Sequence, residues 1–151
     1  MSRKRRPTYE SNAHRATQDS AAERLGEYLG VGIKSTPKYC AYDWEVYGSA
    51  KGEPLLAIAE FKRRRKPRGA YPTLMISADK IMRCRACAAE RGVSFWLVIE
   101  WDDGLGIWDD DGRELESEMG GRTFATRDAG DIEQVVYIPV ADFNELPGFS
   151  F

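Results

Sequence analysis

The chain has 151 residues, 42% of them hydrophobic and 30% charged, which is enough for one ordinary domain with one core. No stretch approaches the roughly 18 uninterrupted apolar residues of a membrane-spanning helix. The arginine-rich start of the chain has no apolar secretion segment behind it. These features argue against a membrane or secreted protein, and we expect a cytoplasmic one.

The formal net charge of -2 conceals two halves of opposite charge. Residues 1–68 hold 15 Lys and Arg against 8 Asp and Glu, a net +7, and residues 69–151 hold 7 against 16, a net -9. A local positive potential attracts phosphates whatever the total charge is, so the basic half indicates a polyanionic partner. Two plain solvated surfaces are the alternative. A third reading is that the acidic half mimics DNA and binds a basic protein.

The N-terminal part of the chain predicts an arm followed by a helix. Residues 1–16 are polar and basic without apolar periodicity, so we expect a disordered arm ahead of one domain over 17–151. Apolar residues at helical spacing then predict a helix that begins at Asp19 or Ser20 and ends at Gly30.

The middle of the chain predicts a hairpin and a basic loop. Residues 38–48 are aromatic, β-branched and alternating, which favours a strand, and 49–54 form a turn. Residues 55–61 are an almost continuous apolar run, typical of a strand buried on both faces. Two prolines, a glycine and many arginines make 62–72 a loop.

A second helix is expected from a serine cap at Ser77 to a closing Gly92, followed by an apolar strand over 93–101. A turn at Asp102 leads into a further strand over 105–109.

The acidic segment 109–131 reads mostly as loop, with 122–127 a candidate short strand, and 135–140 predicts a last strand followed by a short helical turn. The element order predicts a central mixed sheet flanked by helices, an α/β or α+β fold.

Three polar residues stand where two predicted strands meet. Side chains alternate along a strand, so Glu60 and Lys62 share one face, while Phe61 points to the other. Asp43 and Glu45 likewise share a face of the preceding strand, and pairing of the two strands would bring Asp43 to Glu60. Two carboxylates with the Phe61 carbonyl are ligands that Mg²⁺ takes, and a lysine beside them could help an attacking water. A surface ion pair between Glu60 and Lys62 is the alternative.

At these residues the sequence resembles the PD-(D/E)XK nuclease superfamily, whose signature is an acid on one strand and, on the next, an acid two residues before a lysine. Here they stand as Asp43 and Glu60-Phe61-Lys62, and Tyr42 replaces the proline. The resemblance covers about 20–101. It implies a restriction-endonuclease-like α-β-β-α-β core, Mg²⁺ or Mn²⁺, and hydrolysis of DNA in a bacterial or phage-infected cell. It also implies an additional acid on the first helix, Glu23 or Glu27.

Basic residues follow the proposed catalytic strand directly. They would hold phosphates without reading sequence, although a solvated loop is the alternative. One face of the second helix could extend this track. The predicted nucleic-acid-binding residues are Arg63, Arg64, Arg65, Lys66, Arg68, Lys80 and Arg83. Tyr71 near the loop could stack on a base or anchor the loop.

Two other patterns suggest metal sites at first sight. Cys84 and Cys87 form a C-x-x-C, but a second ligand pair is missing, so buried or half-buried free thiols are the main reading and zinc the alternative. Asp109 to Asp111 flank a turn, where aspartate binds its own backbone, so we interpret them as turn residues.

Two further expectations concern partners. A homodimer would let a one-domain nuclease reach two strands, and the aromatic strands near Trp101 and Trp108 are its candidate interface. The rival function is a nuclease fold without catalysis, which binds nucleic acid or inhibits a host protein complex.

Overall fold

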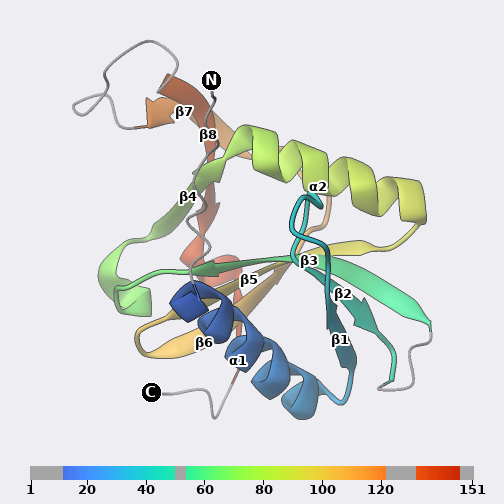
Figure 1. The fold of residues 1–151 in the computed structure, drawn as a ribbon. Helices are drawn as coiled ribbons and strands as arrows, with labels where there is room; N and C mark the ends of the chain where they lie inside the picture. The colour runs from blue at the N-terminus through green and yellow to red at the C-terminus, as the bar shows by residue number, and fades with distance from the viewer. Residues whose placement is uncertain (1–11, 50–53, 122–131, 147–151) are drawn as a thin grey trace, which may run out of the picture.

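The structure, a computed structural model, describes residues 12–49, 54–121 and 132–146, arranged as two sheets with two long helices (Figure 1). The larger sheet has the strand order β1-β2-β3-β5-β6-β9, and the smaller has the order β4-β8-β7. The strands of the larger sheet are β1 (Gly32–Ser35), β2 (Trp44–Tyr47), β3 (Leu55–Arg63), β5 (Ser94–Trp101), β6 (Gly104–Asp109) and β9 (Asn144–Glu145). Those of the smaller sheet are β4 (Thr73–Ser77), β7 (Glu116–Gly121) and β8 (Ile132–Pro139).

Strand β3 is central, as its apolar run predicts. It pairs antiparallel with β2 and parallel with β5, and all its residues from Ala57 to Phe61 are buried. The other pairings in the larger sheet are antiparallel, so the sheet is mixed. The predicted fold class, a mixed sheet flanked by helices, is confirmed.

The two helices cover opposite faces of the larger sheet (Figure 1). Helix α1 (Asn12–Leu29) packs with Ala57, Ala59 and Phe61 of β3. Helix α2 (Ala78–Arg91) packs over Ile58, and it also contacts β4 and β8 of the smaller sheet. Alternate residues of β3 therefore face different helices, which decides where each polar side chain at its end points.

Helix α1 begins earlier than the sequence predicts. It starts at Asn12, so residues 12–16, which we expected in the arm, belong to the helix, while 1–11 lie outside the described residues. Its apolar stripe is short: Ala21 and Leu25 are fully buried, but the first turns of the helix are polar. The helix start therefore could not be predicted from apolar spacing. Gly30, with a φ of 70°, follows the helix at the predicted position.

Helix α2 has the predicted caps. The Ser77 hydroxyl accepts a hydrogen bond from the Lys80 N–H (3.3 Å) in the first turn. Gly92 follows the last turn with a φ of 69°, and its N–H bonds back to the helix. Both ends of this helix are therefore confirmed, and its register fixes which residues face β3.

Several strands differ from the prediction. Strand β2 spans only Trp44–Tyr47, because 38–43 form turns and bends. Three strands were not predicted: β1 and β4, which are short, and β7, which is polar and owes its extended form to pairing with β8. Strand β8 and the helical turn Val140–Asp142 after it are present as predicted. The candidate strand at 122–127 lies outside the described residues.

The tryptophans expected at a dimer interface are core residues instead. Trp101 and Trp108 are only 3% and 2% exposed, and each packs edge-on against a phenylalanine. Their side chains therefore belong to the core, and a homodimer through the strands near them stays a prediction. None of the helices in the described ranges is long and apolar enough to cross a membrane.

Candidate active site

Asp43 is joined to β3 immediately before β2 begins. Its N–H donates to the Ala59 carbonyl (2.9 Å), which continues the β2–β3 ladder by one bond. Its carboxylate then accepts a hydrogen bond from the Phe61 N–H (2.9 Å), so a side chain takes the place of the next ladder partner. Asp43 is thereby held against the Glu60-Phe61-Lys62 segment. The two parts of the predicted motif, the acid before β2 and the acid and lysine on β3, therefore lie together.

Glu60 is a buried carboxylate on the α2 side of the sheet. It is only 7% exposed. Burial, first, and the negative charge of Asp43, second, raise the pKa of Glu60 to about 8, although Lys80 and Lys62 act to lower it. Its Oε1 atom has no hydrogen-bond partner in the structure. A buried acceptor without a donor is costly unless a cation or a polar ligand satisfies it.

Lys62 completes the pattern on the same face of β3. It is half-buried. Its pKa lies below the usual lysine value, because burial disfavours the ammonium and the charge of Arg64 adds to this, against the carboxylates of Glu60 and Asp43. Two carboxylates and an ammonium with a depressed pKa thus meet at one end of the central strand, as the sequence alternation predicts.

Lys80 also belongs to this cluster, which its sequence position did not predict. Its ammonium lies 3.6 Å from Oε2 of Glu60 and 3.4 Å from the Ala41 carbonyl. We expected it on an exposed track for nucleic acid. The Ser77 cap places it in the first turn of α2, but only the packing of α2 on β3 shows that this turn lies over Glu60.

The helix acids Glu23 and Glu27 do not join this cluster. Helix α1 lies on the face that carries Phe61, opposite to that of Glu60. The two acids line a separate hollow formed by α1 and the chain up to Ser35. Among the described residues no three His, Cys, Asp or Glu side chains come together as metal ligands. The expectation of a third carboxylate from the first helix is therefore not met.

The basic loop is more structural than its sequence suggests. Arg63 pairs with Asp102 (2.8 Å), and the Arg64 guanidinium donates to the Met75 carbonyl (2.6 Å). These arginines are half-buried and fasten the end of β3 to neighbouring strands. Charge density alone could not distinguish such anchors from exposed cations.

The remaining basic residues divide in the same way. The Arg68 guanidinium donates to the Val140 carbonyl (3.1 Å), whereas Arg65 and Lys66 are exposed. On α2, Arg83 pairs with Asp79 on the exposed side of the helix (2.9 Å). Arg65 and Lys66 thus remain the most accessible cations near the cluster.

The rival metal patterns have local explanations. Cys84 is buried with its sulfur 3.6 Å from the Ala41 carbonyl, and burial raises the pKa of its thiol to about 12. Asp110 accepts the Gly112 N–H (2.9 Å) and Asp111 the Arg113 N–H (3.1 Å), which confirms that they are turn residues.

Comparisons with known proteins agree with this geometry. No curated protein matches the sequence. A Holliday junction resolvase, Hjc from Archaeoglobus fulgidus, has a similar structure, with a TM-score of 0.55 and 11% identity over 87% of this chain and 94% of that one. This likeness shows the fold. A family model described as "Phage putative PDDEXK endonuclease" matches residues 4–146. Because the match spans nearly the whole chain and includes the Asp43 and Glu60-Phe61-Lys62 cluster, the protein belongs to this phage PDDEXK endonuclease family.

Proposed function

We propose that the chain is a metal-dependent endonuclease that hydrolyses phosphodiester bonds in DNA, with Asp43, Glu60 and Lys62 at its centre. One observation carries the proposal. The buried Glu60 carboxylate, which has an unpartnered oxygen, stands beside Asp43 and on the same strand face as Lys62. A protein without a use for this carboxylate would keep an unsatisfied acceptor at a cost to stability.

The donors present fit a hard divalent cation, Mg²⁺ or Mn²⁺. Asp43 and Glu60 would supply carboxylate oxygens. The Phe61 carbonyl would supply a third, since the N–H and C=O of a strand residue point to the same side and the Phe61 N–H points to Asp43. When bound, the ion would neutralise negative charge on the scissile phosphate and make water more acidic.

Lys62 would act on the water and on the phosphate. Its depressed pKa brings it closer to the range in which an amine can accept a proton, and as an ammonium it stabilises charge that develops on the phosphate oxygens. Lys80 would orient the Glu60 carboxylate, because its ammonium contacts Oε2 and leaves Oε1 for another partner. Arg65 and Lys66 would bind phosphates of the flanking DNA.

Two finer points belong to the same proposal. The chain would act in the cytoplasm of a bacterial or phage-infected cell, where its DNA substrate lies. A homodimer would let it cut two strands, through a surface other than the buried tryptophans.

The direct test is cleavage of supercoiled, linear, branched and single-stranded DNA in Mg²⁺. We expect cleavage that EDTA abolishes and that Glu60→Gln and Lys62→Ala reduce at least a hundredfold, the usual scale for a catalytic acid or base. Glu45→Gln is the matched control. Glu45 lies on β2, two residues after Asp43, but its carboxylate pairs with Arg91 (2.8 Å). Cleavage that survives both active-site substitutions would contradict the proposal.

A second candidate is a nuclease fold that binds nucleic acid or a host protein complex without cutting. The observation in its favour is Lys80, whose ammonium already offers Glu60 a positive charge. Metal discriminates between the two, since Mg²⁺ or Mn²⁺ should raise the melting temperature of the nuclease by binding linkage and leave the inert binder unchanged.

A further inference from the structure

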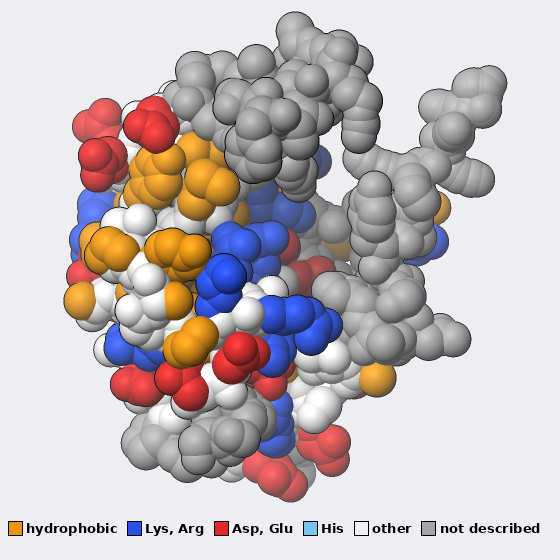
Figure 2. Space-filling model, turned by 90° about the vertical axis from the view of Figure 1, so that its left-hand side faces the viewer, with side chains coloured by type: hydrophobic (Ala, Val, Ile, Leu, Met, Phe, Trp, Pro, Cys, Tyr) orange, Lys and Arg blue, Asp and Glu red, His pale blue; other side chains and the backbone are white. Residues whose placement is uncertain are grey.

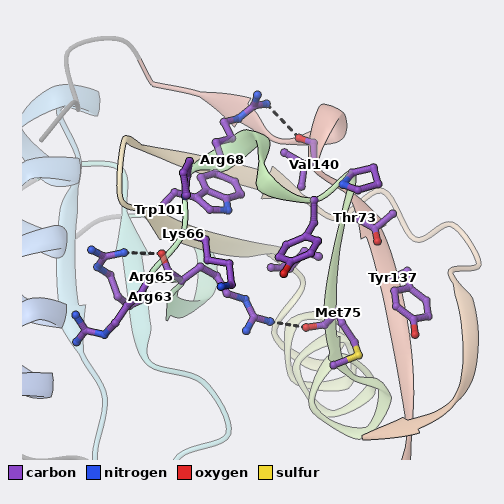
Figure 3. A pocket seen from close by; sticks show the side chains of 14 residues that line it. Arg63, Arg65, Lys66, Arg68, Thr73, Met75, Trp101, Tyr137 and Val140 are labelled. Atoms are coloured by element: carbon purple, nitrogen blue, oxygen red, sulfur yellow. Dashed lines mark hydrogen bonds between the residues drawn. The ribbon is translucent and has the colours of Figure 1, made fainter.

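A hollow of about 550 Å³ lies beside the candidate site, between the basic loop, β4 and β8. Figure 3 shows Arg68 and Trp101 at one side of it, and Met75 and Tyr137 at the other. Arg64 joins the hollow to the cluster of Asp43, Glu60 and Lys62, because it lines the hollow and follows Lys62 by two residues in the chain. A nucleic acid held at Lys62 would therefore extend along this hollow.

The lining combines exposed apolar surface with cations. Tyr71 is 59% exposed and Met75 is 42% exposed, although both are large apolar side chains. The Lys66 ammonium lies 5.9 Å from the centre of the Tyr71 ring. On this side of the molecule, apolar side chains gather next to a band of lysines and arginines (Figure 2).

The walls of the hollow are fixed before any ligand arrives. The Asp102 N–H donates to the Lys66 carbonyl (3.0 Å), and the Arg68 N–H donates to the Asp103 carboxylate (2.8 Å). The Arg68 guanidinium lies over the Trp101 ring, 5.7 Å from its centre. A loop held at three points loses little freedom on binding, so its exposed side chains can contribute to affinity.

We propose that this hollow takes an unpaired nucleotide of the DNA substrate, with the base against Tyr71 and Met75 and its phosphate near Arg65 and Lys66. A nucleotide combines a flat apolar base with an anion, which is the combination that this lining matches. In an uninterrupted duplex the base faces are stacked inside and cannot reach an aromatic side chain. The size of the hollow lies within the range of small-ligand pockets.

This inference rests on the proposed function and narrows its substrate. The chain would prefer branched, gapped or overhanging DNA, in which a base near the cleaved phosphate is already unpaired, because the energy of unstacking is then lowest. The base would be bound by stacking, so that little sequence preference would follow.

The test is a binding measurement without metal. Two fluorescent duplexes are compared in EDTA by anisotropy. One is fully paired, and the other has the same paired sequence with one additional, extrahelical 2-aminopurine nucleotide. We expect tighter binding of the second duplex. Tyr71→Ala should reduce this advantage about fivefold or more, while leaving affinity for the paired duplex nearly unchanged, and Tyr71→Phe should keep it.

Tyr39→Ala is the matched control. Tyr39 is 91% exposed and lies near Lys38 (5.6 Å), so it repeats the lysine–tyrosine pair outside the hollow. Equal affinity of the wild-type chain for both duplexes would overturn the inference and would favour an apolar peptide as occupant. A preference for the second duplex that survives Tyr71→Ala would also overturn the inference. If the wild-type chain shows the binding preference but does not cleave DNA in Mg²⁺, that result would count against the proposed function and not against this inference.

Discussion

The ammonium of Lys80 lies 3.6 Å from the Glu60 carboxylate, across the boundary between α2 and the central strand. It lowers the pKa of Glu60, although burial and Asp43 together hold that pKa at about 8. The register of α2, set by its serine cap, therefore affects the pKa of Glu60 in the candidate site, because it determines where Lys80 lies.

Replacement of Lys80 by Met should change the pH dependence of metal binding. Without the ammonium, Glu60 keeps its proton to higher pH, so the pH midpoint of Mn²⁺ binding should rise. The affinity for Mn²⁺ at neutral pH should fall roughly tenfold for each pH unit by which this midpoint rises. Calorimetric titration at several pH values measures it. Arg83→Met, on the exposed side of α2, is the control, and an unchanged midpoint for Lys80→Met would refute the role.

Stability without metal should depend on pH through Glu60. Its folded-state pKa is raised, so its contribution to stability is fully present below the unfolded value of 4.5 and is lost as pH rises toward about 8. In EDTA the free energy of unfolding should fall by up to about 1.4 kcal/mol per pH unit in this window. Urea unfolding at a series of pH values tests the slope.

Glu60→Gln should flatten that slope, because the amide does not titrate. Glu45→Gln should leave it unchanged: the pKa of Glu45 is lowered, chiefly by its hydrogen bond with Tyr47, so Glu45 is ionised throughout the window. A slope that is the same in the wild type and in Glu60→Gln would contradict the buried carboxylate.

Asp43 should have two separable roles, as a backbone cap and as a metal ligand. Asp43→Asn keeps an oxygen that can accept the Phe61 N–H, so the fold should be retained while stabilisation by Mg²⁺ is lost. Asp43→Ala leaves this N–H unpaired and should cost about 1–3 kcal/mol in addition. Thermal melts of both variants, with and without Mg²⁺, check it; equal stability of the two variants without Mg²⁺ would argue against the cap.

Helix α1 should depend on one ion pair at the end of β5. The side chain of Glu100 is 7% exposed and contacts Arg24 (2.8 Å). Arg24→Ala should destabilise the fold by about 1–3 kcal/mol, since, within the described ranges, the buried Glu100 carboxylate then keeps only the more distant Arg63 (3.8 Å) as an ion-pair partner. Denaturant unfolding measures the loss, and the exposed pair removed by Arg83→Ala should cost less than about 1 kcal/mol. Equal losses would contradict this role.

The sequence predicted those parts of the fold that local signals specify. The central strand follows from its unbroken apolar run, and α2 from Ser77 and Gly92. Strand alternation is also local, so it correctly placed Glu60 and Lys62 on one face. The position of Asp43 required only that neighbouring strands pair.

Other features depend on packing between distant segments and were out of reach. The resemblance implied Glu23 or Glu27, but α1 packs on the opposite face of the sheet, a choice made by the burial of Ala21 and Leu25. Likewise, Arg64 is half-buried and holds a carbonyl on β4, a strand too short to predict. Sequence charge cannot separate such a residue from one that contacts DNA.

Anomalous diffraction from crystals soaked in Mn²⁺ would show where the ion binds. We expect one strong peak within coordination distance of both Asp43 and Glu60, and its loss in Glu60→Gln. A peak only elsewhere, for instance at Asp109 to Asp111, or none at a Mn²⁺ concentration that supports cleavage, would contradict this expectation.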